Sequence, residues 1–343
     1  DAVFLTTADK ALDTQSVLAV SRSGKPLWQN TVHFGGIPKE NHPKNTEASP
    51  TLAFDGESLF ASFYNSGAIW LTKLQPDGKI LWQKNTGAYQ PNRYKYGYAA
   101  SPLIYRDWII LNADFDGAAF LTAIDRSSGQ VIWKTKRPGM ISFSSPMIAS
   151  VGGRDQLLLS GSEMVAGYDP SDGQLLWKTP GATTMATCGT MVWEGDYVLA
   201  SGGYPKSETV CIKATGPDAG KLVWSNRTKC YEQSMIVRDG YVYAVADNGV
   251  AYCWQISDGK TMWRERIGGK YSSSPLLVDD TLCVFSESGD AFVFKAIPER
   301  FQLIEKSKLG DEAFASPVIV NDTLYARVAK REGGRQEYLL AIQ

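Results

Sequence analysis

Short apolar runs alternate with turn residues along almost the whole chain. A run at residues 242–245 follows the pair Asp239-Gly240, and a second run at residues 251–255 follows Asn248-Gly249. Asp-Gly and Asn-Gly pairs supply the positive φ angles of tight hairpin turns. No run of about 18 apolar residues occurs, so the sequence predicts no transmembrane helix. The pattern predicts an all-β protein of short antiparallel strands.

A Gly-x-x-x-Trp unit repeats along the chain. Successive copies are 39 to 54 residues apart, and a degenerate copy ends at Ile304. The six tryptophans are Trp28, Trp82, Trp133, Trp177, Trp224 and Trp263. A period of this length that holds four short strands is typical of a β-propeller blade. We interpret each Trp as structural, because a large ring at a fixed place on the outer strand of each blade packs against the neighbouring blade.

Ser-Pro followed by an apolar run marks the first strand of most periods, where a proline costs little. First strands are predicted to start near residues 49, 101, 145, 189, 234, 274 and 316. The N-terminal residues resemble the last three strands of a blade, and the C-terminal residues resemble the first three. Six complete modules and two incomplete ones predict a single eight-bladed domain over residues 1–343, with seven blades and an N-terminal arm as the alternative. A preceding segment is expected to supply the missing strands, because closure removes exposed sheet edges.

Charge and composition exclude some functions. Lys plus Arg is 35 and Asp plus Glu is 36, so the net charge of −1 argues against nucleic acid as the main partner. With only two histidines, His33 and His42, a His-rich metal site is nearly excluded. The five cysteines lie mostly in apolar runs and are interpreted as buried free thiols. One disulfide, for instance between Cys188 and Cys230, is the alternative.

The loops that follow the fourth strand of each blade are predicted to crowd one face of the propeller, together with the turns between second and third strands. The loop at residues 32–49 holds both histidines, and the loop at residues 87–101 is rich in tyrosine. An aromatic residue also recurs three or four positions before the strand-start proline, which predicts a collar of rings around a central funnel. The candidate ligand-binding residues are His42, Lys44, Asn45, Arg93, Tyr94, Tyr96, Tyr98, Phe143, Tyr231, Glu232, Lys270, Tyr271 and Phe314. Aromatic residues with Arg make good recognition anchors; the alternative is that each ring packs on the neighbouring blade.

The sequence pattern Asp-x-x-x-Gly-x-x-x-Trp occurs at residues 125–133 and 169–177, and it resembles the tryptophan-docking motif of the quinoprotein-like (PQQ-repeat) propellers. The resemblance covers nearly the whole chain, and within this group the chain most resembles the BamB-like proteins, which are non-enzymatic scaffolds of the bacterial envelope. It implies a periplasmic or secreted protein. We expect a monomer that binds a protein or a glycan through its loop-rich face.

Enzymatic members of the same fold are the alternative. The quinone-dependent alcohol dehydrogenases use adjacent cysteines, a Trp beneath the quinone, and calcium held by Glu, Asn and Asp. This chain has no adjacent cysteines, and no such calcium set can be matched. We therefore expect no catalytic residue and no cofactor, with PQQ and calcium, or a carbohydrate-active enzyme, as alternatives.

Two weaker features carry possible chemistry. Asn112, Asp114 and Asp116 place oxygen atoms at alternate positions of a turn, as calcium prefers. The acidic residue that would complete such a loop is absent, which favours an ordinary Asp-Gly turn. His42 lies near Glu40 and could act as an acid or base, but a solvated loop histidine is the preferred interpretation.

Overall fold

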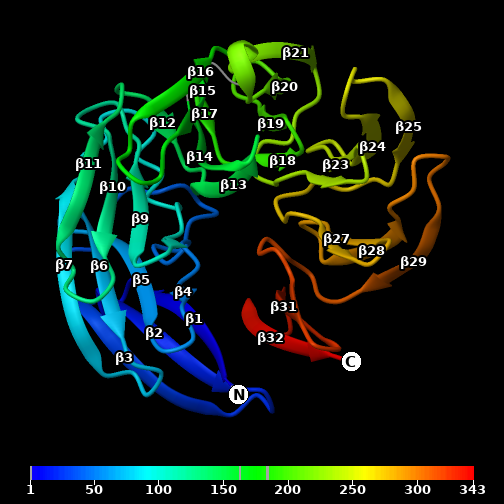
Figure 1. Ribbon diagram of the computed structural model, residues 1–343. Helices are drawn as coiled ribbons and strands as arrows, with labels where there is room; N and C mark the ends of the chain where they lie inside the picture. The colour runs from blue at the N-terminus through cyan, green and yellow to red at the C-terminus, as the bar shows by residue number, and fades with distance from the viewer. Residues whose placement is uncertain (1, 162–163, 183–184) are drawn as a thin grey trace. The chain divides into compact units, whose positions relative to one another are not determined.

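The computed structural model shows a chain that is almost entirely β-structure (Figure 1). It describes residues 2–161, 164–182 and 185–343. Across these residues the strands form eight blade sheets, six of them with four strands and two with three. The fold is an eight-bladed β-propeller, so the prediction of eight blades is confirmed and the alternative of seven is wrong. Within the described ranges, no helix is long and apolar enough to cross a membrane.

The chain divides into two compact units. Unit 1 comprises Asp1–Ile148, Asp155–Gly161 and Gly167–Leu176, and unit 2 comprises Ala149–Arg154, Ser162–Ala166 and Trp177–Gln343. The division passes through blade 4, whose strands are β13 (Met147–Val151), β14 (Arg154–Gly161), β15 (Met164–Tyr168) and β16 (Leu175–Thr179). The expectation of a single domain over residues 1–343 stays a prediction.

Unit 1 contains blades 1 to 3. Blade 1 is β1 (Ala2–Asp9), β2 (Thr14–Ser21) and β3 (Pro26–Phe34). Blade 2 is β4 (Ala53–Phe54), β5 (Leu59–Asn65), β6 (Ala68–Leu74) and β7 (Ile80–Ala88), and blade 3 is β8 (Leu103–Tyr105), β9 (Trp108–Ala113), β10 (Phe120–Asp125) and β11 (Val131–Lys136). The two-residue strand β12 (Ile141–Ser142) follows blade 3.

Unit 2 contains blades 5 to 8, and the short strand β17 (Ala186–Thr187) precedes blade 5. Blade 5 is β18 (Val192–Glu194), β19 (Tyr197–Gly202), β20 (Glu208–Lys213) and β21 (Lys221–Asn226), with the 3₁₀ turn η1 (Gly216–Asp218) before its last strand. Blade 6 is β22 (Ile236–Arg238), β23 (Tyr241–Val245), β24 (Val250–Gln255) and β25 (Thr261–Arg266). Blade 7 is β26 (Leu276–Val278), β27 (Thr281–Phe285), β28 (Asp290–Lys295) and β29 (Leu303–Lys308), and blade 8 is β30 (Val318–Val320), β31 (Thr323–Lys330) and β32 (Gln336–Ile342).

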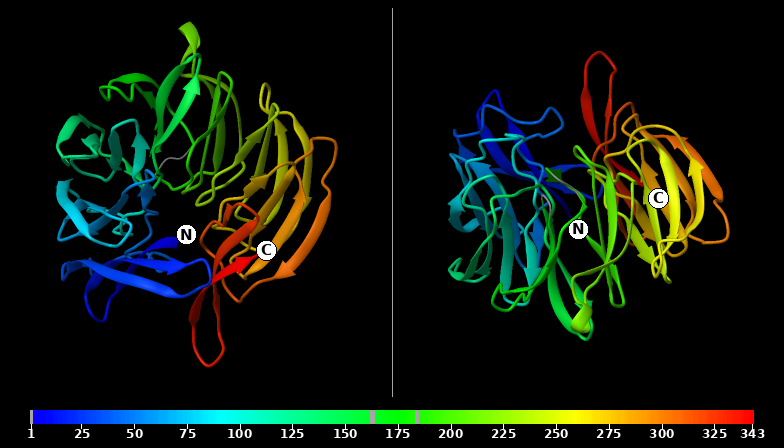
Figure 2. Two further views of the ribbon diagram at one scale, coloured as in Figure 1. Left: turned by 60° about the horizontal axis from the view of Figure 1, so that its bottom comes forward. Right: turned by 90° about the horizontal axis from the view of Figure 1, so that it is seen from above.

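Consecutive strands pair in every blade sheet, so each blade is a meander. Connections in a meander alternate between its two ends. The turn between second and third strands and the loop after the fourth strand therefore share one end, which we call the loop end of the blade. The long turn between β31 and β32 lies at this end of blade 8 and extends beyond the other strands of unit 2 (Figure 2).

Each motif tryptophan in blades 1 to 3 packs against the motif glycine of the following blade. Trp28 Nε1 donates to the carbonyl oxygen of Pro76 at 3.0 Å, and a Cβ on Gly78 would lie 2.9 Å from the Trp28 ring. Trp133 Nε1 donates in the same way to Pro170, at 3.1 Å. The Nε1 atoms of Trp82, Trp224 and Trp263 donate to the carbonyl oxygens of Ser127, Ile256 and Ile297. We call this contact between a tryptophan ring and the motif glycine of the next blade the tryptophan wedge. The motif requires glycine because the ring occupies the space that a glycine replacement's side chain would need.

The serine that opens the first strand links neighbouring blades. The Ser101 hydroxyl accepts a hydrogen bond from the Thr51 amide, and the Ser145 hydroxyl accepts one from the Ser101 amide, both at 2.9 Å. In unit 2 the hydroxyls of Ser234, Ser274 and Ser316 accept from the amides of Thr190, Ser234 and Ser274. Each hydroxyl thus satisfies a backbone donor of the preceding blade.

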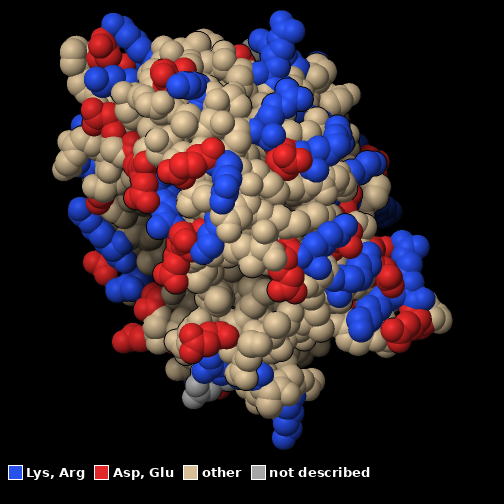
Figure 3. Space-filling model, turned by 90° about the vertical axis from the view of Figure 1, so that its right-hand side faces the viewer, with Lys and Arg blue, Asp and Glu red and all other residues tan. Residues whose placement is uncertain are grey.

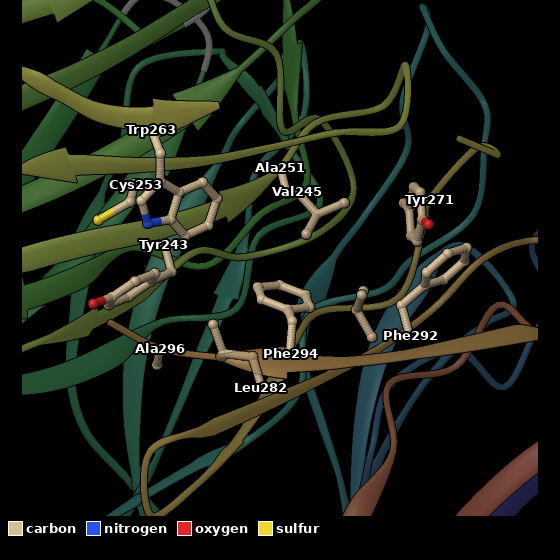
Figure 4. Close-up of a cluster of buried hydrophobic side chains, with 11 residues drawn as sticks. Tyr243, Val245, Ala251, Cys253, Trp263, Tyr271, Leu282, Phe292, Phe294 and Ala296 are labelled. Atoms are coloured by element: carbon tan, nitrogen blue, oxygen red, sulfur yellow. The ribbon is translucent and has the colours of Figure 1, made fainter. Parts of the chain in front are cut away.

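A buried aromatic cluster joins blades 6 and 7 (Figure 4). Tyr243 and Trp263 come from blade 6, and Phe294 comes from blade 7. The Trp263 ring centroid lies 6.2 Å from that of Tyr243 and 6.5 Å from that of Phe294. In the degenerate copy of the repeat, Trp263 packs on the ring of Phe301 at 5.5 Å. Burying a large apolar side chain of this kind contributes about 1.5–3 kcal/mol.

Replacing Gly173 with alanine is expected to destabilise the protein by about 2–4 kcal/mol. The added Cβ would lie 2.6 Å from the Trp133 ring, and such overpacking costs about 1–3 kcal/mol. The φ angle of Gly173 is 73°, which costs about 1 kcal/mol more for an L-residue. Gly24→Ala is the matched control, because Gly24 has a φ of 85° at the same motif position but no described atom within 4 Å of an added Cβ. Urea unfolding measures both variants, and equal losses would contradict the wedge.

Candidate functional site

Loops from blades 1 to 3 bring four rings together at the loop end of unit 1. Tyr96 is central: its ring centroid lies 5.0 Å from His42, 5.4 Å from Tyr94 and 6.2 Å from Phe143. The first two contacts are edge-to-face and the third is stacked. All four side chains are half-buried. We call His42, Tyr94, Tyr96 and Phe143 the aromatic strip.

Polar contacts hold the aromatic strip in place. Asn45 Nδ2 donates to the Tyr96 carbonyl oxygen at 2.9 Å, and Asn45 Oδ1 accepts from the Glu47 amide at 2.7 Å. Gly97 allows this approach, because a Cβ at Gly97 would lie 2.6 Å from Asn45 Nδ2. His42 Nδ1 accepts from the amide of Lys44 at 3.2 Å. Four of the predicted residues in the first two loops are therefore joined directly, through side chain or backbone.

The second loop is also fixed from below by the β9–β10 turn. The two carboxylate oxygens of Asp116 accept from the amides of Asn92 and Arg93 at 2.8 and 2.9 Å. The Arg93 side chain is exposed, and Arg93 precedes Tyr94 of the strip in sequence. Lys95 is also exposed and lies 3.6 Å from the Glu40 carboxylate.

Tyr98 lies in the core beneath the strip. It belongs to a buried cluster with Tyr89 and Phe115, and its hydroxyl donates to the Asn112 carbonyl oxygen at 3.0 Å. Burial raises the pKa of the Tyr89 and Tyr98 hydroxyls. Tyr98 therefore supports the loop from inside and presents no ring to the solvent.

A fully buried ion pair lies at the loop end of blade 3. Arg137 Nε donates to Asp114 Oδ1 at 2.6 Å, and both side chains have no exposed area. Arg137 Nη1 donates to the Tyr168 hydroxyl at 2.5 Å. Burial acts to lower the pKa of Arg137, but the charge and hydrogen bond of Asp114 outweigh it and raise the pKa above its ordinary value. The guanidinium is therefore charged and held by two oxygen partners.

The same contacts account for the oxygen-rich turn at residues 112–117. Asp114 is paired with Arg137, and the Asn112 side-chain amide donates to Asp114 Oδ2 at 3.3 Å and to the Ser144 carbonyl oxygen at 3.2 Å. Asp116 holds backbone amides of the neighbouring loop. No group of three or more His, Cys, Asp or Glu side chains able to hold a metal occurs in the described part of the chain. The cationic partner of this turn is Arg137.

The candidates in unit 2 occupy different environments. Tyr271 is buried in the cluster between blades 6 and 7. Tyr231 is half-buried with Lys229 Nζ 5.1 Å from its ring centroid, and its amide donates to Asp247. Lys270 is exposed, and Glu232 and Phe314 are half-buried. The predicted collar of rings around a funnel stays a prediction.

The histidines and cysteines differ from one another in setting. His33 lies in β3 and is buried, so the prediction that both histidines lie in the loop is wrong for His33. None of the five cysteines forms a disulfide, so the alternative of a Cys188–Cys230 bridge is wrong; Cys211, Cys230 and Cys253 are buried as expected, but Cys188 and Cys283 are only half-buried. Burial raises the pKa of Cys211, Cys230 and Cys253 to about 12, which makes these thiols poor nucleophiles.

Sequence reasoning misses Arg137. Its context, Lys136-Arg137-Pro138-Gly139, is typical of an exposed loop at the end of a strand. The available signal is Asp114, an acid that follows the apolar run Ile109–Leu111 closely and needs a partner if it is buried. Which cation fills that role depends on contacts across 23 residues.

The repeat, the wedge contacts and the loop-end site define a PQQ-repeat β-propeller. The family model described as "Outer membrane protein assembly factor BamB" matches residues 13–265 and 206–297. The chain belongs to this family. The BamB of Moranella endobia (strain PCIT) is 23% identical over 257 residues, which are 72% of this chain and 64% of the relative. The matched region thus spans less than two thirds of that relative's length.

Solved structures show the same fold. The BamB structure from Moraxella catarrhalis has a TM-score of 0.64 at 16% identity, over 95% of this chain and 94% of that chain. A europium-containing methanol dehydrogenase has a TM-score of 0.70 at 12% identity, over 96% of this chain and 81% of that chain. At these identities the likeness concerns the fold alone, and the fold is shared by a BamB protein and a methanol dehydrogenase.

Proposed function

We propose that this protein is a non-catalytic scaffold of the bacterial envelope that binds a protein partner through the loop end of blades 1 to 3. The observation that carries the proposal is the aromatic strip. Its four rings are half-exposed, contact one another and are held by hydrogen bonds from two sides. Rigid aromatic side chains beside an Arg are the usual anchors of protein interfaces.

The chemistry of the residues does not fit a calcium–quinone site. The cysteines are separated in sequence by at least 19 residues, so no pair can form the ring of adjacent cysteines. Asp114, the central acid of the oxygen-rich turn, is neutralised by Arg137 at 2.6 Å. A cation at this turn would have to displace a buried guanidinium. We therefore propose binding without a quinone cofactor.

The relatives support an envelope role. Two proteins that resemble this chain bear the name BamB, and one is named an outer membrane protein assembly factor. We propose that this chain acts in the periplasm as a monomer. The face in Figure 3 shows Lys and Arg interspersed with Asp and Glu, without a large field of one sign. Such a surface fits a protein partner better than nucleic acid.

Tyr96→Ala is expected to weaken partner binding by about 2 kcal/mol, or roughly 30-fold, because Tyr96 contacts the other three rings of the strip. The protein with a photoreactive benzoylphenylalanine in place of Tyr96 is crosslinked in envelope fractions to capture the partner. The affinity of the purified partner for wild type and Tyr96→Ala is then measured by calorimetry.

Tyr204→Ala is the matched control, since Tyr204 is an exposed tyrosine of unit 2. It is expected to leave the affinity unchanged. Thermal shift with PQQ and calcium, and with a panel of oligosaccharides, tests the other classes. Stabilisation by PQQ would overturn the scaffold proposal, and stabilisation by a sugar that depends on Tyr96 would make the partner a glycan.

A further inference from the structure

The turn that carries His42 depends on the protonation state of its ring. His42 Nδ1 accepts a hydrogen bond from the amide of Lys44 at 3.2 Å, and the His42 carbonyl oxygen accepts one from the amide of Asn45 at 2.8 Å. We call residues 41–45 the His42 turn. A ring nitrogen accepts a hydrogen bond only while it carries no proton, and both ring nitrogens are donors in the imidazolium form. Protonation of Nδ1 therefore removes the bond to Lys44 and places two donors against each other.

The His42 turn is joined to the centre of the aromatic strip in two ways. The His42 ring meets the Tyr96 ring edge-to-face, with 5.0 Å between the centroids. Asn45, at the end of the turn, donates from its side-chain Nδ2 to the Tyr96 carbonyl oxygen at 2.9 Å. Asn41 Nδ2 donates to the Asn45 carbonyl oxygen at 2.9 Å, so the turn and the side chain that holds Tyr96 form one hydrogen-bonded unit. A change at His42 Nδ1 therefore acts on the residue that holds Tyr96.

Histidine is the side chain whose ordinary charge change falls between about pH 5 and 8. The other histidine of the chain, His33, is buried, and burial lowers its pKa to about 4, so it stays neutral over this window. On the loop-end elements that form the strip, Glu40 lies 3.6 Å from Lys95. The remaining charged or titratable side chains of these two loops and of the β1–β2 turn with its ends are Asp9, Lys10, Asp13, Lys39, Lys44, Glu47, Tyr89, Arg93, Tyr94, Tyr96 and Tyr98, and residues 138–146 of the third loop contain none. A change of charge in this window is therefore assigned to His42.

Glu47 is the acid of this loop that responds to protons with the opposite sign. Its amide donates to Asn45 Oδ1 at 2.7 Å, and its carboxylate is buried 3.4 Å from Lys10 Nζ. Burial raises the pKa of the Glu47 carboxyl. Because the folded chain then binds this proton more readily than the unfolded chain, neutralisation of Glu47 stabilises the folded loop as the pH falls. Protonation of His42 instead removes a bond, so the direction of the change distinguishes the two groups.

We propose that His42 is a pH sensor that releases the aromatic strip when its ring is protonated. The inference deepens the proposed function and rests on it, since it names the regulation of the same site. With a neutral ring the His42 turn is closed and Asn45 holds Tyr96 in the strip. With a protonated ring the turn opens at Lys44, and the loss of one hydrogen bond shifts such a local equilibrium roughly fivefold. Water replaces the bond at this half-exposed position, so the opening is local and is measured at the loop itself.

Nuclear magnetic resonance of the purified chain, labelled with ¹⁵N in His, Lys and Asn, tests the proposal without a partner. At pH 8 the His42 ring is expected to carry its proton on Nε2 and none on Nδ1. As the pH falls to 5, the Lys44 amide and the Asn45 side-chain amide are expected to shift with the same midpoint as the His42 ring. A proton on Nδ1 at pH 8, or amide signals that do not follow the ring, overturns the proposal.

Two variants separate the hydrogen bond from the ring. His42→Asn keeps an acceptor for the amide two residues on, as in an Asx turn, but cannot be protonated. It is expected to hold the Lys44 amide signal constant from pH 8 to 5. His42→Phe keeps a ring beside Tyr96 without an acceptor, and it is expected to show the open-state signals at every pH.

Glu47→Gln is the matched control, because it removes the buried carboxyl of the same loop. It is expected to leave the response of the Lys44 and Asn45 signals to pH unchanged. If the response is lost in Glu47→Gln and retained in His42→Asn, Glu47 is the sensor and the proposal is overturned.

Crosslinking at position 96 in envelope fractions connects the sensor to the proposed function. The yield is expected to fall roughly fivefold from pH 7.5 to 5.5 with His42 present, and to stay constant in His42→Asn. If position 96 gives no crosslink at either pH, the proposed function fails, while the resonance experiment still decides whether His42 controls the turn. If the crosslink forms equally at both pH values although the turn opens, the proposed function stands and regulation by His42 is overturned.

Discussion

Asp114→Asn is expected to destabilise the protein by about 3–5 kcal/mol. The substitution leaves the Arg137 guanidinium without its 2.6 Å carboxylate partner in a place where neither side chain has exposed area. Removing one member of a buried ion pair is costly because the other charge stays buried and uncompensated. Urea unfolding followed by circular dichroism measures the loss as a lower midpoint at an unchanged slope.

The double variant Asp114→Leu/Arg137→Met is expected to recover much of this loss, since buried pairs can be replaced by apolar side chains at little cost. Glu40→Gln is the surface control. The Glu40 carboxylate lies 3.6 Å from Lys95 Nζ, both side chains are exposed, and exposed ion pairs contribute about 0–1 kcal/mol. If Asp114→Asn and Glu40→Gln had equal effects, the buried pair would not stabilise blade 3 as argued.

The second large effect is pH-dependent and comes from His33. The side chain is 9% exposed, with its ring 5.9 Å from Phe63 and 5.6 Å from Trp70. Burial lowers the pKa of His33 from 6.5 to about 4. Between these values the unfolded chain binds the proton and the folded chain does not. The contribution of neutral, buried His33 to the free energy of unfolding is therefore fully present above pH 6.5. It falls by about 3 kcal/mol as the pH falls to 4, because each pKa unit corresponds to about 1.36 kcal/mol.

Urea unfolding at pH 7, 5.5 and 4 checks this expectation by comparing slopes against pH. His33→Gln is expected to reduce the slope of the free energy of unfolding against pH between pH 4 and 6.5, whatever its effect on stability at pH 7. His42→Gln is the matched control, since His42 is the other histidine and lies half-exposed in the loop. The same slope in His33→Gln and wild type would show that another group controls the acid response.

The loop residues show why a site is harder to predict than a fold. Tyr96 and Tyr98 are two positions apart in one tyrosine-rich loop, and the sequence gives both the same interpretation. In the structure Tyr98 is buried with its hydroxyl on Asn112, while Tyr96 is half-exposed in the strip. The difference arises from neighbouring loops, which contribute His42 and Phe143 from 54 and 47 residues away in sequence. No local pattern contains that information.

By itself the sequence determined the eight blades of this protein. Gly-x-x-x-Trp spacing, Ser-Pro strand starts and Asp-Gly turns act within one repeat, and a blade is a meander of consecutive strands. Only the tertiary structure decided which side chains are buried or exposed at the loop end. At this end Asp114 forms an ion pair with Arg137, His33 packs against aromatic rings, and the side chains of Leu12 and Phe34 are exposed to solvent. The physical reason is that burial and pairing depend on the adjacent blade and loop, whereas strands and turns depend mainly on residues close in the chain.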